Sequence, residues 1–159
     1  MLYFAYGSNM LLKRLKDRVP SASRTAVGYI CGHRLTFDKR SIDGSGKCDA
    51  QATSDSKDKV YGVVYEIDPV EKATLDRVEG LGHGYAEKVV EVNCGTTIRP
   101  VCMYYATSKD LSLRPYHWYK AYVLAGAREN SLPLEYIKMI ERFPSVQDPD
   151  ARRSKMHRL

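Results

Sequence analysis

Leu2-Tyr3-Phe4-Ala5-Tyr6-Gly7-Ser8-Asn9-Met10 is the stretch that decides how this chain begins its fold. Its first five residues are rich in aromatic side chains, which favours a β-strand, and Gly7 marks the end of that strand. Asn9 has a side chain suited to capping a helix, and a helix is predicted over residues 10–17, before Pro20. The stretch therefore predicts a strand-to-helix junction.

This junction has two interpretations. A glycine allows a ligand to approach the backbone closely, and the free amides of a helix N-terminus attract a carboxylate or a developing oxyanion. Alternatively, Gly7 only relieves a tight turn and Asn9 only caps a helix. The pattern by itself leaves both interpretations open and favours the second.

A glutamate is the next candidate for chemistry. Glu79-Gly80 follows a helix predicted over residues 68–78, with Asp68 as its N-cap and Pro69 at its first position. A carboxylate at a helix C-terminus costs roughly 0.3–1 kcal/mol, because the dipole there favours cations. Such a carboxylate beside a glycine-rich loop is a candidate general acid or base. A solvated glutamate next to a flexible loop fits the pattern equally well.

The remaining elements are read from hydrophobic pattern and turn residues. Strands are expected over residues 26–38, with bends at Gly28 and Gly32, and then over residues 60–67, 88–92 and 101–106. Helices are expected over residues 116–127 and 131–143. The polar segment 39–59 is expected to be a long loop, with strand pairing only around residues 50–53. The predicted fold class is α+β, with a curved or barrel-like sheet.

The first of these late helices opens with the aromatic run Tyr116-His117-Trp118-Tyr119. Tyr119 and Tyr122 share one helix face, because they are three residues apart. Most of these rings are expected to pack in the core. One tyrosine hydroxyl is left open as a pocket residue.

Composition bounds the class of protein. The chain has 159 residues, of which 43% are hydrophobic and 28% are charged, as in ordinary globular proteins. These values exclude a disordered or fibrous chain and predict a single domain with a real core. No apolar run reaches the roughly 18 residues of a membrane helix, and the N-terminus does not resemble a signal peptide. A soluble cytoplasmic protein is therefore expected.

Half of the net charge of +6 lies in the last ten residues. In the last ten residues a single acid, Asp150, is outnumbered by four basic residues: Arg152, Arg153, Lys155 and Arg158. Such a tail could bind nucleic acid or an acidic partner, but a solvated, frayed terminus is the favoured interpretation. The predicted organisation is one domain over residues 1–146 and a basic tail over residues 147–159.

Cysteine and histidine spacing does not favour a metal site. The four cysteines contain no C-x-x-C pair: Cys31, Cys48, Cys94 and Cys102. The four histidines show no spacing typical of metal ligands. Neither a zinc site nor a redox motif is expected, and the cysteines are predicted to be free thiols.

Four blocks of this sequence resemble the γ-glutamylcyclotransferase family. They are residues 3–10 (YFAYGSNM), residues 60–65 with 75–80 (VYGVVY and LDRVEG), residues 84–85 with 89–92 (GY and VVEV) and residues 126–136 (GARENSLPLEY). The combination is specific because the blocks occur in the family's order, from residue 3 to about residue 140. The Tyr-Gly-Ser-Asn motif alone would indicate only the broad superfamily.

The resemblance implies a small curved β-barrel with flanking helices. It also implies an enzyme that converts a γ-glutamyl amino acid or dipeptide to 5-oxoproline and a free amino acid without a cofactor. The family's catalytic glutamate falls on Glu79, as a proton shuttle. Its substrate-binding positions fall on these residues: Tyr6, Gly7, Ser8, Asn9, Met10, Tyr85 and Tyr119. The expected partner is a small γ-glutamyl substrate. Neither a membrane nor nucleic acid is expected, and a homodimer is left open.

Two alternatives to this function stay open. Within the superfamily, the substrate could instead be a γ-glutamylamine, or a γ-glutamyl group removed during a biosynthesis. The block at residues 126–136 favours the enzyme for amino-acid substrates. In a different class, the chain could be a non-catalytic basic binding module on the same fold. The presence of Glu79 argues against that class, because a binding module has no need of this carboxylate.

Overall fold

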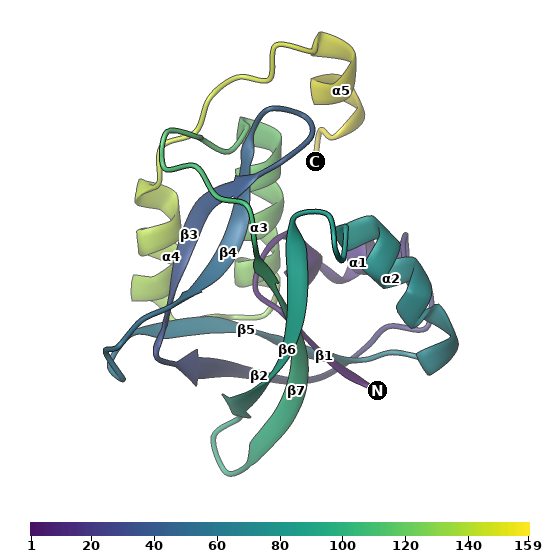
Figure 1. Ribbon diagram of the computed structural model, residues 1–159, viewed down its shortest axis with the longest axis vertical. Helices are drawn as coiled ribbons and strands as arrows, with labels where there is room; N and C mark the ends of the chain where they lie inside the picture. The colour runs from purple at the N-terminus through teal and green to yellow at the C-terminus, as the bar shows by residue number, and fades with distance from the viewer.

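A closed barrel forms the base of the molecule in the computed structural model, which describes residues 1–159 (Figure 1). Around the barrel the strands are β1 (Leu2–Ala5), β5 (Lys59–Glu66), β2 (Ser23–Cys31), β6 (Tyr85–Asn93) and β7 (Ile98–Ala106). The barrel is mixed, because β1 pairs antiparallel with β5 and parallel with β7. With helices flanking this barrel, the predicted α+β fold is confirmed.

The pairing of β1 with β5 anchors the core. Phe4, Val63, Val64 and Tyr65 are fully buried, and burial of each such side chain contributes roughly 1.5–3 kcal/mol to folding. Gly62 allows the two strands to approach closely, since a Cβ there would lie 2.4 Å from the carbonyl oxygen of Ala5. The buried strand β1 therefore holds the turn that follows it in a fixed place.

A second, two-stranded sheet extends away from the barrel. It consists of β3 (His33–Arg40) and β4 (Gly46–Ala52), and it lies beside α3 (His117–Glu129) and α4 (Leu134–Arg142) (Figure 1). Gly32, with a φ of 70°, makes the predicted bend between β2 and β3. The two helices agree with the predicted helical segments to within a few residues.

Strand β4 lies in the segment 39–59, so the predicted pairing around residues 50–53 is confirmed over residues 50–52, whereas the long loop expected before it is wrong. Its apolar residues Cys48, Ala50 and Ala52 are small and alternate with polar residues, and ion pairs hold the polar side chains. Lys47 Nζ lies 2.9 Å from Asp43 Oδ2, and Asp49 Oδ2 lies 2.7 Å from the amine of Lys109. Charged side chains can be buried in this way only when each finds a partner in the folded chain.

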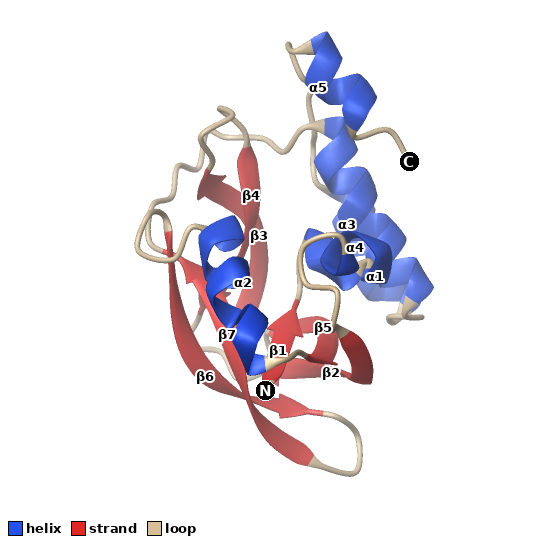
Figure 2. Ribbon diagram, turned by 90° about the vertical axis from the view of Figure 1, so that its right-hand side faces the viewer, coloured by secondary structure: helices blue, strands red, loops and turns tan.

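The chain leaving β1 passes through a single 3₁₀ turn, η1 (Ser8–Met10), before the short helix α1 (Leu12–Lys16). The predicted helix over residues 10–17 is therefore interrupted at its start. Figure 2 shows α2 on one side of β1, and α3 with α4 on the other. The turn after β1 thus lies between helices that are far apart in the sequence.

The helix before the glycine-rich loop has the predicted boundaries. The turn η2 (Pro69–Glu71) leads into α2 (Lys72–Glu79), and the Asp68 side chain accepts a hydrogen bond from the Val70 N–H. Gly80 ends the helix with a φ of 78°, a left-handed conformation that favours glycine. None of the helices in the chain is both long and apolar enough to cross a membrane.

The C-terminal residues are ordered, and the expectation of a frayed terminus is wrong. The tail forms the helix α5 (Ala151–Met156), and the ring of His157 stacks on Trp118 with centroids 4.0 Å apart. Buried Asp148 accepts hydrogen bonds from Trp118 Nε1 at 2.8 Å and from Arg153 at 2.6–2.7 Å. These contacts hold the tail against α3. The domain boundary at residue 146 stays a prediction.

Candidate active site

A pocket of about 30 Å³ lies where the turn after β1 meets β4 and the ends of α2 and α3. Aromatic and polar residues line it: Tyr3, Phe4, Tyr6, Gly7, Ser8, Asn9, Cys48, Glu79, Tyr85, Tyr104 and Tyr119. The fold therefore brings all the expected site residues except Met10 to one place.

Glu79 is the only carboxylate in the pocket wall. It is the last residue of α2, its side chain is 17% exposed, and its Oε1 atom lies 3.8 Å from Arg18 Nη1. Burial raises the pKa of Glu79 above its usual range, while Arg18, Asn9 and Lys39 act in the opposite direction. A carboxyl group with a raised pKa exchanges protons more readily near neutral pH.

Asn9 fixes the position of this carboxylate. Its Nδ2 atom donates to Glu79 Oε1 at 2.6 Å and to the Tyr3 hydroxyl at 3.2 Å, and its Oδ1 atom accepts from Arg18 at 2.9 Å. The expected role as a helix N-cap is wrong, because Asn9 lies inside η1 and its side chain makes no capping bond. Asn9 instead joins the first turn of the chain to the end of α2.

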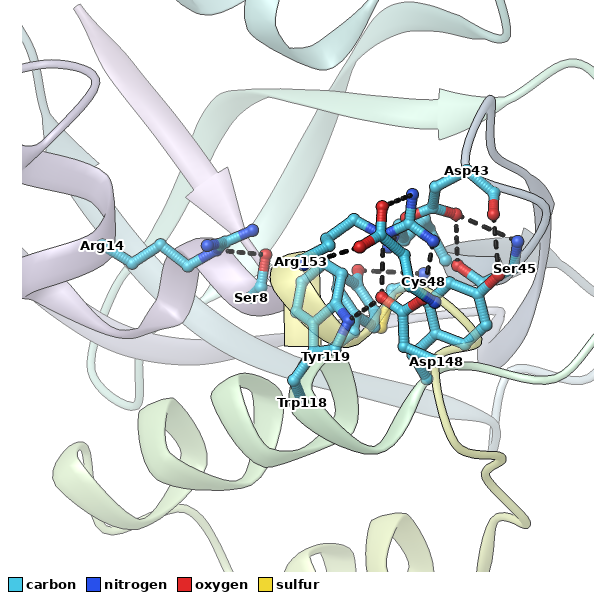
Figure 3. A network of polar contacts seen from close by, with 12 residues as sticks. Ser8, Arg14, Asp43, Ser45, Cys48, Trp118, Tyr119, Asp148 and Arg153 are labelled. Atoms are coloured by element: carbon cyan, nitrogen blue, oxygen red, sulfur yellow. Dashed lines mark hydrogen bonds and ion pairs between the residues drawn. The ribbon is translucent and has the colours of Figure 1, made fainter. Parts of the chain in front are cut away.

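Gly7 and Ser8 pack tightly against other elements of the site. A Cβ at position 7 would lie 3.1 Å from Cys48 Cβ and 3.2 Å from the Tyr119 hydroxyl. Ser8 is buried, and its Oγ atom accepts a hydrogen bond of 3.1 Å from Arg14 Nε, as Figure 3 shows. A side chain at position 7 would therefore press on Cys48 and Tyr119.

The tyrosine hydroxyls of the pocket differ in whether they donate or accept hydrogen bonds within the protein. Tyr6 donates to the Tyr104 carbonyl oxygen and Tyr85 to the Cys48 carbonyl oxygen, each at 2.7 Å. Tyr119 instead accepts a 3.1 Å hydrogen bond from the Cys48 N–H (Figure 3). The Tyr119 hydroxyl donates to no oxygen or nitrogen of the protein, so its proton stays available to a ligand, whereas those of Tyr6 and Tyr85 are bound.

Comparison with known proteins identifies the family. The model of the AIG2-like family matches residues 59–140. The γ-glutamylcyclotransferase of Bos taurus is 35% identical over 144 residues, which cover 87% of this chain and 76% of that protein. The Homo sapiens protein of the same name is 36% identical over 149 residues, with coverage of 88% and 78%.

The chain belongs to the γ-glutamylcyclotransferase family. A solved structure named γ-glutamyl cyclotransferase superposes with a TM-score of 0.88 at 28% identity, covering 99% of this chain and 97% of the other. A yeast γ-glutamyl cyclotransferase specific to glutathione, at 12% identity and a TM-score of 0.62, shares the fold. The resemblance described from the sequence is thereby confirmed.

As a member of this family the protein is an enzyme, so its interpretation as a non-catalytic binding module is wrong. Met10, the remaining residue expected to bind substrate, does not line this pocket. Its side chain is fully buried against α3, because a Cβ added to Gly126 would lie only 2.7 Å from the Met10 Cβ atom. The Met10 N–H donates to the Gly7 carbonyl oxygen. Met10 anchors the turn to α3.

Sequence reasoning missed several members of the site. Tyr3, Cys48 and Tyr104 line the pocket although no motif marked Cys48 or Tyr104. Arg14 and Arg18 were also missed. Arg14 lies in α1 and Arg18 lies just after it, and their spacing of four residues places the two side chains on the same side of the chain. That spacing next to a candidate anion site is the signal that could have found them.

Proposed function

We propose that this enzyme converts a γ-glutamyl amino acid into 5-oxoproline and the free amino acid. The α-amine of the γ-glutamyl group attacks its own γ-carbonyl carbon, so a C–N bond forms and closes a five-membered ring. The amide bond from that carbon to the leaving nitrogen breaks, and the proton lost by the α-amine ends on the leaving amine. Attack within one molecule reaches effective molarities of roughly 10⁵–10⁸ M when the reactive conformer is held.

The observation that carries this proposal is the Glu79 carboxylate, held at 2.6 Å by Asn9 inside the pocket. Glu79 would accept the proton of the attacking amine and then deliver it to the leaving amine. One carboxylate suffices for both steps because they follow one another at the same carbon. The raised pKa of Glu79 supports this role, since proton transfer is most efficient when the pKa lies near the working pH.

The oxyanion formed during attack needs hydrogen-bond donors. Tyr119 would donate its free hydroxyl proton to this oxygen. The amides of Ser8 and Asn9 open the 3₁₀ turn and are further donors for the polar oxygens of the γ-glutamyl group. A three-residue turn has almost no helix dipole, so this cradle relies on the amides themselves.

The chemistry explains why no protein nucleophile and no cofactor are required. The substrate supplies nucleophile, carbonyl and leaving group, and no atom changes its oxidation state. Cys48 is the only thiol in the pocket wall, and burial raises its pKa to about 12, so it stays protonated and is a poor nucleophile. Tyr85, whose proton is bound to the Cys48 carbonyl oxygen, would shape the wall of the pocket.

The test is the identity of the product. Incubation of the purified protein with γ-glutamyl-alanine is expected to release 5-oxoproline and alanine in equal amounts. Its matched control is α-glutamyl-alanine, which has the same atoms but no γ-amide, and which should not react. Release of glutamate together with alanine would mean that water is the nucleophile, and this result would overturn the proposal.

A further inference from the structure

Two lysines face each other across the β3–β4 sheet next to the candidate active site. Lys39 and Lys47 are direct partners in the antiparallel register, so their side chains leave the same face of the sheet. Lys39 Nζ lies 4.5 Å from the centroid of the Tyr85 ring, and Lys47 Nζ lies 4.4 Å from that of Tyr119. Like charges directly opposite in a sheet are destabilising, so this pair calls for an explanation.

Only one of the two lysines has an acidic partner. Lys47 is paired with Asp43 at 2.9 Å. Lys39 is only 8% exposed, yet no carboxylate lies within 4.0 Å of its amine, and that amine donates no hydrogen bond to the protein. Burial lowers the pKa of Lys39, whereas the nearby charges of Glu79 and Asp43 act in the opposite direction. The stem of Lys39 is therefore buried, while its amine keeps contact with solvent and is available to bind an anion.

The surroundings of Glu79 show the same excess of positive charge. Arg14, Arg18 and Lys39 all lie close enough to Glu79 to lower its pKa. Arg18 is balanced by Glu79 itself, at 3.8 Å. The Arg14 guanidinium lies over the Tyr122 ring, and its Nε atom donates to the Ser8 hydroxyl. No carboxylate is paired with it. Two unbalanced cations therefore remain beside the pocket, and they suit a ligand with two negative charges.

We propose that Lys39 binds the carboxylate of the leaving amino acid, an inference that rests on the proposed function. Lys39 does not line the pocket of about 30 Å³ but lies over the face of Tyr85, one of its walls. It is therefore placed to meet the part of the substrate that extends out of the pocket, which is the leaving group. Lys39 then selects γ-glutamyl amino acids against γ-glutamylamines, whose leaving amine carries no carboxylate.

The experiment compares two substrates that differ only in this carboxylate, γ-glutamyl-alanine and γ-glutamyl-ethylamide. The wild-type enzyme should prefer γ-glutamyl-alanine at least about tenfold in kcat/KM, because hydrogen bonds to charged groups are worth roughly 1.5–3 kcal/mol. Lys39→Met should remove this preference by lowering kcat/KM for γ-glutamyl-alanine alone. Lys39→Arg keeps the charge and should retain part of the preference.

Lys88→Met is the matched control. Lys88 also holds its amine over a tyrosine ring, 5.1 Å from the centroid of Tyr105, but this ring is outside the pocket wall. This variant should keep the wild-type preference.

The outcomes separate the two proposals. If the wild-type protein releases 5-oxoproline from neither substrate, the proposed function itself is wrong. If it turns over both substrates equally well, only the role of Lys39 is overturned, and this result does not depend on whether any variant folds. An equal loss on both substrates in a folded Lys39→Met protein would also overturn that role, because it would place Lys39 on the γ-glutamyl group or on the fold.

Discussion

Asn9 and Glu79 are 70 residues apart in the sequence, yet Nδ2 of one donates a 2.6 Å hydrogen bond to Oε1 of the other. The same asparagine accepts from Arg18, so its amide orientation is set from both sides. The carboxylate is thereby held in the pocket wall. A general base needs this kind of fixed position, because proton transfer requires contact at about 2.6–3.2 Å.

The first prediction concerns this hydrogen bond. It lowers the pKa of Glu79, so its loss in Asn9→Ala should raise that pKa further. The base form of Glu79 would then appear only at higher pH, and the acidic limb of the kcat/KM profile should move in the alkaline direction. A pH–rate profile measures this shift. Asn130→Ala, which removes a buried asparagine that bonds Met10 and Gly126, should lower Tm without moving the limb.

The second prediction concerns the proton shuttle. Glu79→Gln keeps the shape and hydrogen-bonding capacity of the side chain but cannot relay a proton, so turnover should fall by about 10²–10⁴-fold. Substrate binding should persist. Glu91→Gln, an exposed residue of β6, is the control and should keep wild-type turnover. Turnover within a few-fold of wild type in Glu79→Gln would assign catalysis to another group.

The third prediction uses the same variant to examine stability. The pKa of Glu79 is raised in the folded state, so ionising it costs stability once the pH exceeds its unfolded pKa. Glu79→Gln should therefore be more stable than the wild type near neutral pH. The gain should shrink as the pH falls through the usual carboxyl range, where Glu79 is protonated in both states. Denaturant unfolding at several pH values measures this trend, and a gain independent of pH would contradict it.

The fourth prediction separates two pocket tyrosines. Tyr119→Phe removes a hydroxyl whose proton is free, and it should lower kcat by about 10²–10³-fold, as expected for loss of an oxyanion donor. Tyr85→Phe removes a hydroxyl already bound to the Cys48 carbonyl oxygen, so it should mainly lower Tm. Steady-state kinetics and thermal melts on both variants check this contrast. The assignment fails if the two variants lose kcat equally.

The fifth prediction concerns the C-terminal tail. Deletion of residues 147–159 removes the Asp148 acceptor of Trp118 and the ring of His157 that stacks on it. A hydrogen bond to a charged acceptor is worth about 1.5–3 kcal/mol, so Tm should fall by at least about 3 °C. Deletion of residues 158–159 alone should leave Tm unchanged. An equal Tm for the longer deletion would support an independent domain over residues 1–146.

Local signals along the chain are enough for much of the fold. Asp68 and Pro69 start a helix, and Gly80 ends it, through side-chain and backbone preferences that act within a few residues. The barrel strands likewise follow from runs of aromatic and β-branched residues. The position of Glu79 at the end of α2 is therefore predictable from the amino-acid sequence alone.

Tertiary structure decided the features that depend on long-range pairs. Strand β4 has only small apolar residues, and the buried charge of Asp49 is neutralised by Lys109, which is 60 positions away. Asn9 looks like a helix cap in the sequence, but Glu79 and Arg18 give its side chain better partners in the fold. The burial of Lys39 could not be predicted either, because Lys39 lies in a polar segment of the sequence. The sequence by itself determined most of the elements and the candidate carboxylate. Only tertiary structure decided which side chains meet it, because desolvation and ion pairing act between residues that are neighbours in space.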